Sequence, residues 1–223
     1  MAMPGAAVAD TAALPLDWRE RLRARLLSVP DHRPEHWRVG GTMAPPTPVM
    51  RAALAREPYP AAVLVPLIDR SVGPTVLLTV RADALRQHAG QISFPGGRLE
   101  DADVDPLAAA LRETTEETGI EARFVQPLGF LPDHLVLTGF RITPVVALVQ
   151  PGFTLRPAPG EVSEIFEMPL QHLLHPGNYR SARRLLRGVE MEALDLLYGA
   201  HNIWGATAGM LGSLREQLQE ALP

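Results

Sequence analysis

The stretch FPGGRLEDADVDPLAAALRETTEETGI, residues 94–120, carries the start and end signals of one helix and a dense group of charged residues. Asp105 is a favourable N-cap residue, and Pro106 suits the first position of a helix. Gly119 suits the left-handed conformation that ends many helices. The sequence therefore predicts a helix that begins at Pro106 and ends at Gly119, directly after a tight glycine pair and an acidic turn.

Three glutamates of this helix lie on one face, because residues at i, i+3 and i+4 are neighbours on a helix. Glu113, Glu116 and Glu117 would repel one another there unless a cation lay between them. Mg²⁺ prefers oxygen ligands and commonly binds a few carboxylates together with substrate phosphates, and Mn²⁺ accepts the same donors. We therefore predict a magnesium site on these glutamates; the alternative is an acidic helix face in contact with solvent.

The side of the helix opposite the glutamates is expected to face the core, because it carries the more apolar residues. The residues on that side are Leu107, Ala108, Leu111, Thr115 and Thr118. Upstream, Gly96 and Gly97 leave the backbone bare, so that its amide and carbonyl groups can approach a metal ion or a phosphate. The glycine pair therefore favours the site over the solvated helix face.

The segment RETTEETGI, residues 112–120, resembles the second half of the Nudix box, R-E-x-x-E-E-x-G followed by a hydrophobic residue. Thr114 stands where an aliphatic residue is usual. The turn before the helix is one residue longer than in the box and places Asp103 at its first acidic position. The resemblance implies that the three glutamates act in catalysis as metal ligands, and we expect Arg112 to orient them through an ion pair.

A second motif overlaps the first. Residues 77–100 read LLTVRADALRQHAGQISFPGGRLE, which resembles the signature of the coenzyme A pyrophosphatases within the Nudix family. Ala82 replaces a serine of that signature, and Glu100 replaces an aspartate. The resemblance implies a substrate-binding role for two arginines, which are candidates for phosphate contacts, and for the glycine pair. These residues are Arg81, Arg86, Gly96 and Gly97.

The resemblance implies the Nudix fold, an α/β/α arrangement with a mixed β-sheet between helices, and Mg²⁺-dependent hydrolysis of a nucleoside diphosphate. For coenzyme A (CoA) the products would be 4′-phosphopantetheine and 3′,5′-ADP. The alternatives are an enzyme for ADP-ribose or a dinucleotide, and a non-catalytic nucleotide-binding module, against which the three retained carboxylates argue. Glu164, with Glu161 close to it, is the downstream carboxylate expected to serve as a further catalytic ligand or base.

The composition is that of an ordinary globular chain, since 46% of the 223 residues are hydrophobic and 21% are charged. The net charge of −4 argues against a nucleic-acid binder, and the absence of cysteine excludes disulfides and thiolate ligands. Residues 1–16 lack the basic start of a signal peptide, and no apolar run approaches a membrane span in length. We expect a soluble cytoplasmic protein whose partner is a small nucleotide; its oligomeric state stays open.

Two parts are expected along the chain: an N-terminal extension, residues 1–58, and a Nudix hydrolase domain, residues 59–223. In the extension, a capping-box pattern at Asp17 and Glu20 predicts a helix over residues 17–29, before a proline-rich loop.

Apolar and alternating runs predict most elements of the second part. Strands are expected at residues 61–68, 75–80, 124–131, 140–149 and 161–168. Pro66 predicts a bulge or an edge strand, because proline cannot donate a ladder hydrogen bond. Residues 178–198 suit either a hairpin about Arg187-Gly188 or a helix, and residues 203–222 suit a long amphipathic helix.

Overall fold

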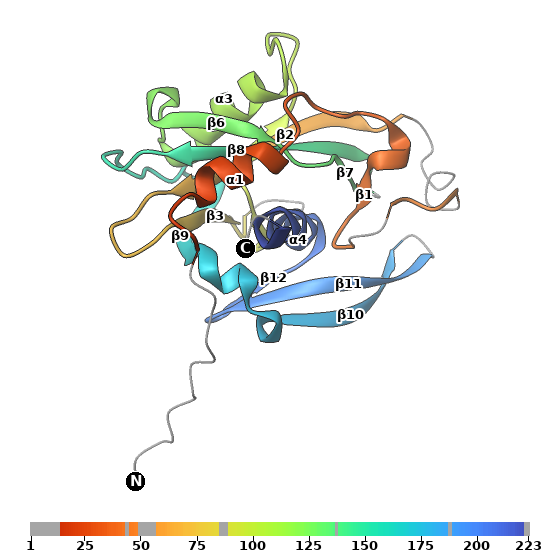
Figure 1. The fold of residues 1–223 in the computed structure, drawn as a ribbon. Helices are drawn as coiled ribbons and strands as arrows, with labels where there is room; N and C mark the ends of the chain where they lie inside the picture. Colours follow the sequence, from red (N-terminus) through yellow and green to blue (C-terminus); the bar gives the residue numbers. More distant parts are fainter. Residues whose placement is uncertain are drawn as a thin grey trace.

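The computed structural model describes residues 14–42, 45–48, 57–84, 89–136, 138–186 and 189–220, and Figure 1 shows their arrangement. The helices are α1 (Trp18–Arg25), α3 (Pro106–Thr118) and α4 (Gly205–Glu220). The larger sheet contains β1 (Arg38–Val39), β2 (Tyr59–Ile68), β3 (Thr75–Arg81), β4 (Ile92–Ser93), β5 (Gly96–Arg98), β6 (Val125–Phe130), β7 (His134–Val136), β8 (Phe140–Val149) and β9 (Val162–Pro169). The smaller sheet contains β10 (Tyr179–Leu186), β11 (Val189–Tyr198) and β12 (His201–Ile203).

The larger sheet is mixed, and its central pair is parallel. Strand β2 pairs with β8 along its whole length, from Tyr59 opposite Phe140 to Ile68 opposite Val149. On its other side β2 pairs antiparallel first with β5 and then with β3. Strand β9 extends the sheet beyond β3, and β6 and β7 pair antiparallel with β8. The glycine strand β5 is therefore placed beside the most central strand of the molecule.

Helices cover both faces of this sheet. Along β2, Val63 and Val65 point into the main core with α1 and α4, whereas Ala62 and Leu64 point toward α3. This alternation follows from the two-residue period of a strand, and the near-continuous apolar run of β2 follows from its burial on both sides. The α/β/α arrangement that the resemblance implies is confirmed, with α3 on one face and α1 and α4 on the other (Figure 1).

The predicted strands are confirmed, with one exception in interpretation. Strand β8 has the predicted bounds, and the other strands differ by one or two residues at their ends. Pro66 does not lie on an edge strand, because it pairs with Ala147 of β8 in the middle of the sheet. Proline is tolerated there because β2 changes partner between Val63, which pairs with β5, and Leu67, which pairs with β3.

The N-terminal helix is shorter than predicted. It ends at Arg25 rather than near residue 29, because Leu27 forms an antiparallel bridge with Phe130. The predicted capping box is wrong: Asp17 makes no side-chain cap hydrogen bond and pairs instead with Arg21. The apolar face of the helix nevertheless enters the main core through Trp18 and Leu22.

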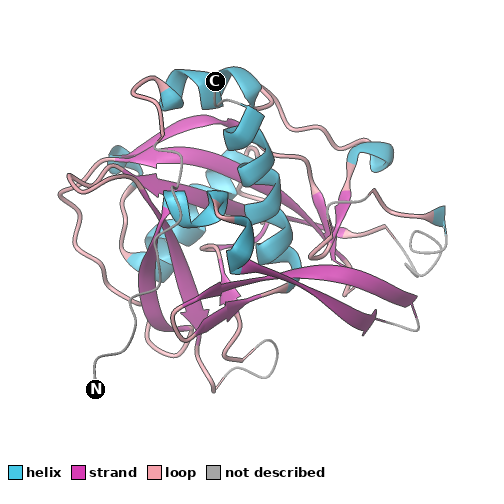
Figure 2. Ribbon diagram, turned by 60° about the horizontal axis from the view of Figure 1, so that its bottom comes forward, coloured by secondary structure: helices cyan, strands magenta, loops and turns pink. Residues whose placement is uncertain are grey.

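Of the two alternatives for residues 178–198, the structure shows the hairpin. Strands β10 and β11 pair antiparallel from Tyr179 opposite Leu196 to Leu186 opposite Val189, and the predicted turn at residues 187–188 lies outside the described residues. The predicted last helix is confirmed as α4, although Ile203 belongs to β12. Figure 2 shows α4 lying between the larger sheet and the smaller one. No described helix is both long and apolar enough to cross a membrane.

A close contact joins the loop after β1 to α4. A Cβ atom on Gly209 would lie 2.2 Å from the carbonyl oxygen of Gly40, so only glycine allows this approach. The buried His134 ring bridges the same elements, with Nδ1 3.4 Å from the Gly40 carbonyl oxygen and Nε2 3.2 Å from Ser213 Oγ. Burial lowers the pKa of His134 to about 4. The ring is therefore neutral near pH 7, and Nδ1–H donates to Gly40 while Nε2 accepts from Ser213.

We predict that Gly209→Ala destabilises the fold, because the new methyl group would meet backbone rather than a movable side chain. Overpacking of this kind typically costs about 1–3 kcal/mol. Intrinsic helix propensity alone would favour alanine by about 1 kcal/mol, so the two effects have opposite signs. Chemical denaturation measures the free energy of unfolding. Gln219→Ala, at an exposed position of the same helix, is the control and should stay within about 0.5 kcal/mol of the parent chain.

Candidate active site

Helix α3 is fixed at both ends by the predicted caps. The Asp105 side chain accepts a hydrogen bond of 2.8 Å from the backbone N–H of Ala108, and Gly119 adopts a left-handed conformation with φ of 77°. Its side toward the sheet contains small residues, among them Ala109 and Ala110, which pack with Ala62 of β2. Small side chains bring the helix close to β2 and β5, so that its glutamates reach the glycine pair.

The predicted inner face of α3 is wrong in most positions. The buried residues are Ala109, Ala110, Thr114, Glu117 and Thr118, whereas Thr115 is exposed and Leu107 and Leu111 are half-buried. The helix is turned so that Glu117, predicted on the outer face, points inward. Thr114 is tolerated in place of an aliphatic residue because its hydroxyl donates to the Ala110 carbonyl oxygen at 2.6 Å.

The Glu117 carboxylate lies beneath the glycine strand. Its residue is only 5% exposed, and Oε2 accepts a hydrogen bond of 3.1 Å from the backbone N–H of Gly96. Burial raises the pKa of Glu117 to about 7, against the opposing effect of that hydrogen bond. The charges of Glu113 and Glu161 raise it further, and the charge of Arg81 lowers it. A buried carboxylate with so few partners is well suited to a cation.

The Glu113 carboxylate fills the space that a side chain at position 97 would occupy. A Cβ atom on Gly97 would lie 2.3 Å from Glu113 Oε1, so a side chain at this position would displace the Glu113 carboxylate. Burial raises the pKa of Glu113, while the hydrogen bond from Arg112 opposes that shift. The structure thus brings together Glu113, Glu117 and the two glycines, four of the residues that the sequence predicted for one site.

Arg112 connects the acidic residues around the turn. Its Nε and Nη2 atoms donate to the two carboxylate oxygens of Asp103 at 3.2 and 2.9 Å, and Nη1 donates to Glu113 at 2.9 Å. The paired guanidinium holds the pKa of Asp103 below its usual range. The longer turn therefore still delivers Asp103 to Arg112, and Arg112 has the ion pair with Glu113 that we expected.

Glu116 points away from the glycine strand. Its side chain is exposed and lies 3.4 Å from Arg112 Nη1. Within the part of the chain that the structure describes, no three His, Asp or Glu side chains stand close enough together to hold a metal ion as they are. The predicted set of ligands is thus only partly assembled, because Glu113 and Glu117 face the glycines while Glu116 contacts Arg112.

The structure does not bring Glu164 to this group. Glu164 lies opposite Val80 of β3, and Val80 packs on the main core. The Glu164 carboxylate lies 3.3 Å from His201 Nε2. That face of the sheet is opposite α3. Glu161 instead acts on Glu117 through its charge. The sequence prediction named both carboxylates but committed to Glu164; Glu164 lies within β9, whereas Glu161 lies in the turn just before it.

Arg81 lies at the end of β3, where the pairing with β9 shifts register between Val80 and Arg81. Its charge reaches Glu117, and its buried Nε–H has no hydrogen-bond partner among the described residues. Arg86, the second predicted arginine, lies outside the described residues. Of the two, only Arg81 can therefore be placed, and it lies beside the carboxylates.

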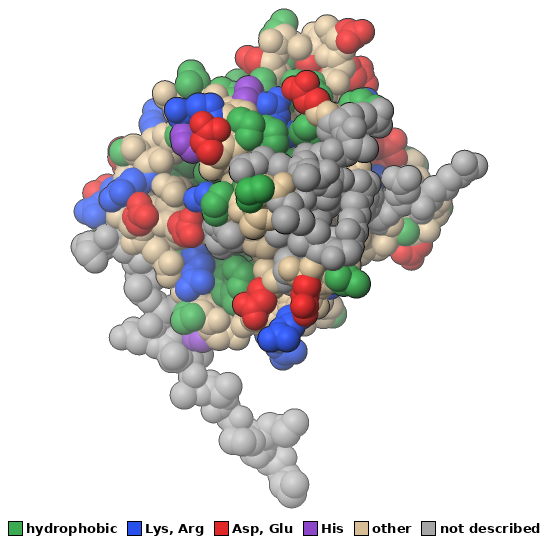
Figure 3. Space-filling model, turned by 90° about the vertical axis from the view of Figure 1, so that its right-hand side faces the viewer, with side chains coloured by type: hydrophobic (Ala, Val, Ile, Leu, Met, Phe, Trp, Pro, Cys, Tyr) green, Lys and Arg blue, Asp and Glu red, His purple; other side chains and the backbone are tan. Residues whose placement is uncertain are grey.

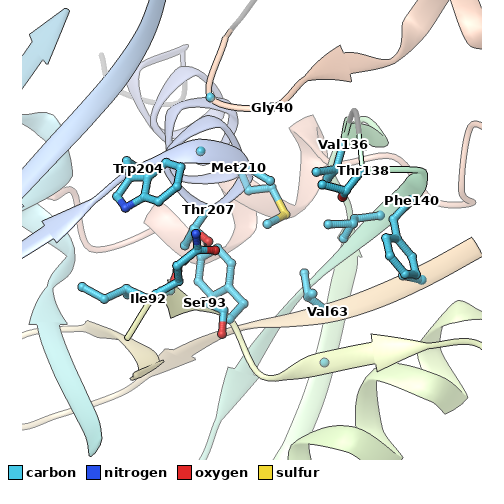
Figure 4. Close-up of a pocket in the computed structure, with 18 of the residues that line it drawn as sticks. Gly40, Val63, Ile92, Ser93, Val136, Thr138, Phe140, Trp204, Thr207 and Met210 are labelled. Atoms are coloured by element: carbon cyan, nitrogen blue, oxygen red, sulfur yellow. Dashed lines mark hydrogen bonds between the residues drawn. The ribbon is translucent and has the colours of Figure 1, made fainter. Parts of the chain in front are cut away.

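A cavity of about 490 Å³ adjoins the glycine strand and Arg81. Figure 4 shows its far wall, where the side chains of Trp204, Thr207 and Met210 face those of Val63 and Phe140 across the space. The sequence prediction missed this wall. No local signal could have found it, because its residues come from segments far apart in the chain.

Comparisons with known proteins show the family of this chain. A family model described as the NUDIX domain matches residues 58–188. The "Uncharacterized Nudix hydrolase NudL" of Shigella flexneri is 40% identical over 173 residues, which cover 76% of this chain and 90% of that protein. The protein of the same name from Escherichia coli (strain K12) is 42% identical over 158 residues, covering 71% and 82%. A MutT/nudix family protein from Enterococcus faecalis, 14% identical, has a similar fold with a TM-score of 0.50, over 74% of this chain and 63% of that one.

We predict that Glu117→Gln changes how stability depends on pH in metal-free protein. A carboxyl group whose pKa rises from 4.5 to about 7 on folding favours the folded state below pH 4.5, and this advantage is lost as pH rises to 7. The glutamine side chain of the variant does not ionise, so the variant does not lose this stability as pH rises. Between pH 4.5 and 8 the variant should gain on the order of 3 kcal/mol relative to the parent chain, measured by urea denaturation in EDTA.

The control for this experiment is Glu121→Gln, because Glu121 is exposed and pairs with Arg123 at the surface. Its stability should follow the parent chain at every pH. Parallel curves for the parent chain and Glu117→Gln would contradict the buried position of the Glu117 carboxylate.

Proposed function

This chain belongs to the Nudix hydrolase family, and we propose that the pyrophosphate bond it hydrolyses is that of CoA or an acyl-CoA. The products would be 3′,5′-ADP and 4′-phosphopantetheine or its acyl derivative. Nudix hydrolases act on pyrophosphate bonds, and their substrates are small nucleotide-type molecules. On the face shown in Figure 3, acidic and basic side chains of the described residues are interspersed.

The observation that carries this proposal is how the structure distributes the motif of residues 77–100. Leu77, Leu78 and Phe94 of the motif are buried in the core. The polar and glycine positions are different: Arg81, Gly96 and Gly97 line the cavity beside Glu113 and Glu117. The signature that resembles CoA pyrophosphatases therefore supplies one wall of a ligand-sized cavity, and the glycines of that wall also contact Glu113 and Glu117.

The residues present suit the divalent cation that Nudix hydrolases typically use. All the donors at the site are oxygens, which favours Mg²⁺ or Mn²⁺, and burial raises the pKa of the Glu117 carboxylate although the charge of Arg81 lowers it. We propose Glu113 and Glu117 as the carboxylates that hold the ion, with Glu116 able to join them because it is exposed. When bound, such an ion neutralises phosphate charge and lowers the pKa of a bound water.

The other groups of the site position these carboxylates and the substrate. Arg112 holds Glu113 in place through its ion pair, and the Gly96 N–H holds Glu117. Arg81 lies close enough to act on Glu117 and lines the cavity, so we assign it to oxygens of the pyrophosphate. A pyrophosphate repels nucleophiles through its negative charge, and this set of groups offsets that charge.

We predict that CoA has the highest kcat/KM in a comparison of CoA, ADP-ribose and NADH at one magnesium concentration, with product release followed by chromatography. Activity should disappear in EDTA and return with added Mg²⁺ or Mn²⁺. If ADP-ribose were cleaved tenfold or more faster than CoA, the CoA assignment would be wrong and the family assignment would stand.

We also predict that Glu113→Gln and Glu117→Gln each lower kcat far more than they affect folding. Mutation of a residue that hydrogen-bonds to a metal ligand typically lowers metal affinity or activity by roughly 10- to 100-fold, so loss of a ligand itself should lower kcat by at least that factor. Glu121→Gln is again the matched control and should keep the parent rate. If both site variants kept nearly the activity of the parent chain, the assignment of these carboxylates as metal ligands would be wrong.

A further inference from the structure

The cavity beside the glycine strand β5 has two chemically different ends. The end near the site contains Arg81, Arg98 and the glycine pair. The far end contains aliphatic and aromatic side chains, and acidic residues do not line it among the described residues. The apolar residues of the far end are Val39, Ala193, Trp204, Ala206 and Met210, and Val63, Ile92, Val136, Phe140 and Ile142 line the rest of the cavity. A substrate whose diphosphate lies at the first end would extend its substituent toward the second.

Apart from Arg184, the far end is built by segments outside the part of the chain that the NUDIX model matches, residues 58–188. Val39, Gly40 and Gly41 come from the N-terminal side, and residues 204–207 with Met210 come from the C-terminal side. The Gly40–Gly209 contact and the buried His134 hold these two segments together. The shared domain thus supplies the reacting end, and this chain adds a preformed wall.

Among the described residues, the guanidinium at the far end is that of Arg184, and its charge is already neutralised. Arg184 Nη2 lies 2.6 and 2.8 Å from the two carboxylate oxygens of Asp195, and its guanidinium carbon lies 4.7 Å from the centre of the Trp204 ring. Asp195 is buried. An arginine held in this way offers hydrogen-bond donors without much net charge, which suits a neutral acceptor better than a phosphate.

We propose that this cavity binds the uncharged arm of the substrate, the pantetheine side of CoA, and leaves the nucleotide half outside it. This inference rests on the proposed function. Pantetheine combines a dimethyl-substituted carbon with amide groups and carries no charge, so it matches an apolar wall with a few donors. The nucleotide half carries a further phosphate, and burying that charge against Val, Ile, Phe and Met side chains would be unfavourable.

The test fills the far end of the cavity from two sides. Ala206 lines the cavity in the first turn of α4, where Ala206→Leu adds volume in a residue that favours helix. Thr138 lies at the opposite rim in an exposed turn, so Thr138→Trp adds volume without disturbing the core. Ala200→Leu makes the same change as the first variant at an exposed turn away from the cavity and is the matched control.

Three substrates separate the halves of the molecule: CoA, 3′-dephospho-CoA, and a methyl ester of 3′-phospho-ADP that has the diphosphate but no arm. We expect both filling variants to lower kcat/KM for CoA and 3′-dephospho-CoA by roughly 10- to 200-fold, as added methylenes do in apolar pockets. The arm-less ester should be cleaved at the parent rate, and this rate also shows that the variants are folded. The control should match the parent on all three substrates.

The outcomes distinguish this inference from the proposed function. If the parent chain cleaves CoA well but the filling variants lower the rate for the arm-less ester as much as for CoA, the cavity holds the nucleotide half and the inference is overturned. If the variants leave all three rates unchanged, the arm lies elsewhere and the inference is again overturned. If the parent chain itself fails to cleave CoA, the proposed function fails first.

Discussion

The site depends on one buried carboxylate. Glu117 projects from α3 under the glycine strand, where the Gly96 N–H is its only hydrogen-bond donor among the described residues. A buried charge is unfavourable unless something compensates it, so this placement needs a reason beyond stability. The buried position of Glu117 arises because small residues on α3 and the absence of a side chain at Gly97 allow the helix and the glycine strand to approach closely. The fold thus accepts an electrostatic cost at the position where a cation would act.

The local features of this arrangement could be predicted from sequence, and the packing could not. Asp105, Pro106 and Gly119 set the ends of α3, because capping involves only neighbouring residues. The inner face of the helix was predicted incorrectly, because hydrophobicity ranks leucine above alanine and threonine. Close approach to β2 and β5 required small residues on that face, and this requirement comes from a partner strand that the helix sequence does not contain.

The choice between Glu161 and Glu164 failed for a related reason. Glu161 precedes the first residue of β9, and the side of the sheet that Glu164 faces depends on the register of β9 with β3, where a shift of one residue exchanges the two faces. The ladder also shifts register next to Arg81, so the alternation could not be carried back from the well-defined part of the strand. The far wall of the cavity was beyond prediction altogether, because it forms only when residues 39–41 meet α4.

The two ends of the cavity therefore carry different kinds of information in the sequence. The reacting end comes from one continuous segment, residues 77–117, so a motif can describe it. The far end comes from residues separated by most of the chain, and the contact between Gly40 and Gly209 holds it in one shape. A wall already held in shape does not have to be ordered when a ligand binds, so more of the contact energy is available for choosing among substrates. For this reason the motif identifies the chemistry, whereas selectivity for the group attached to the diphosphate has to be read from the folded wall.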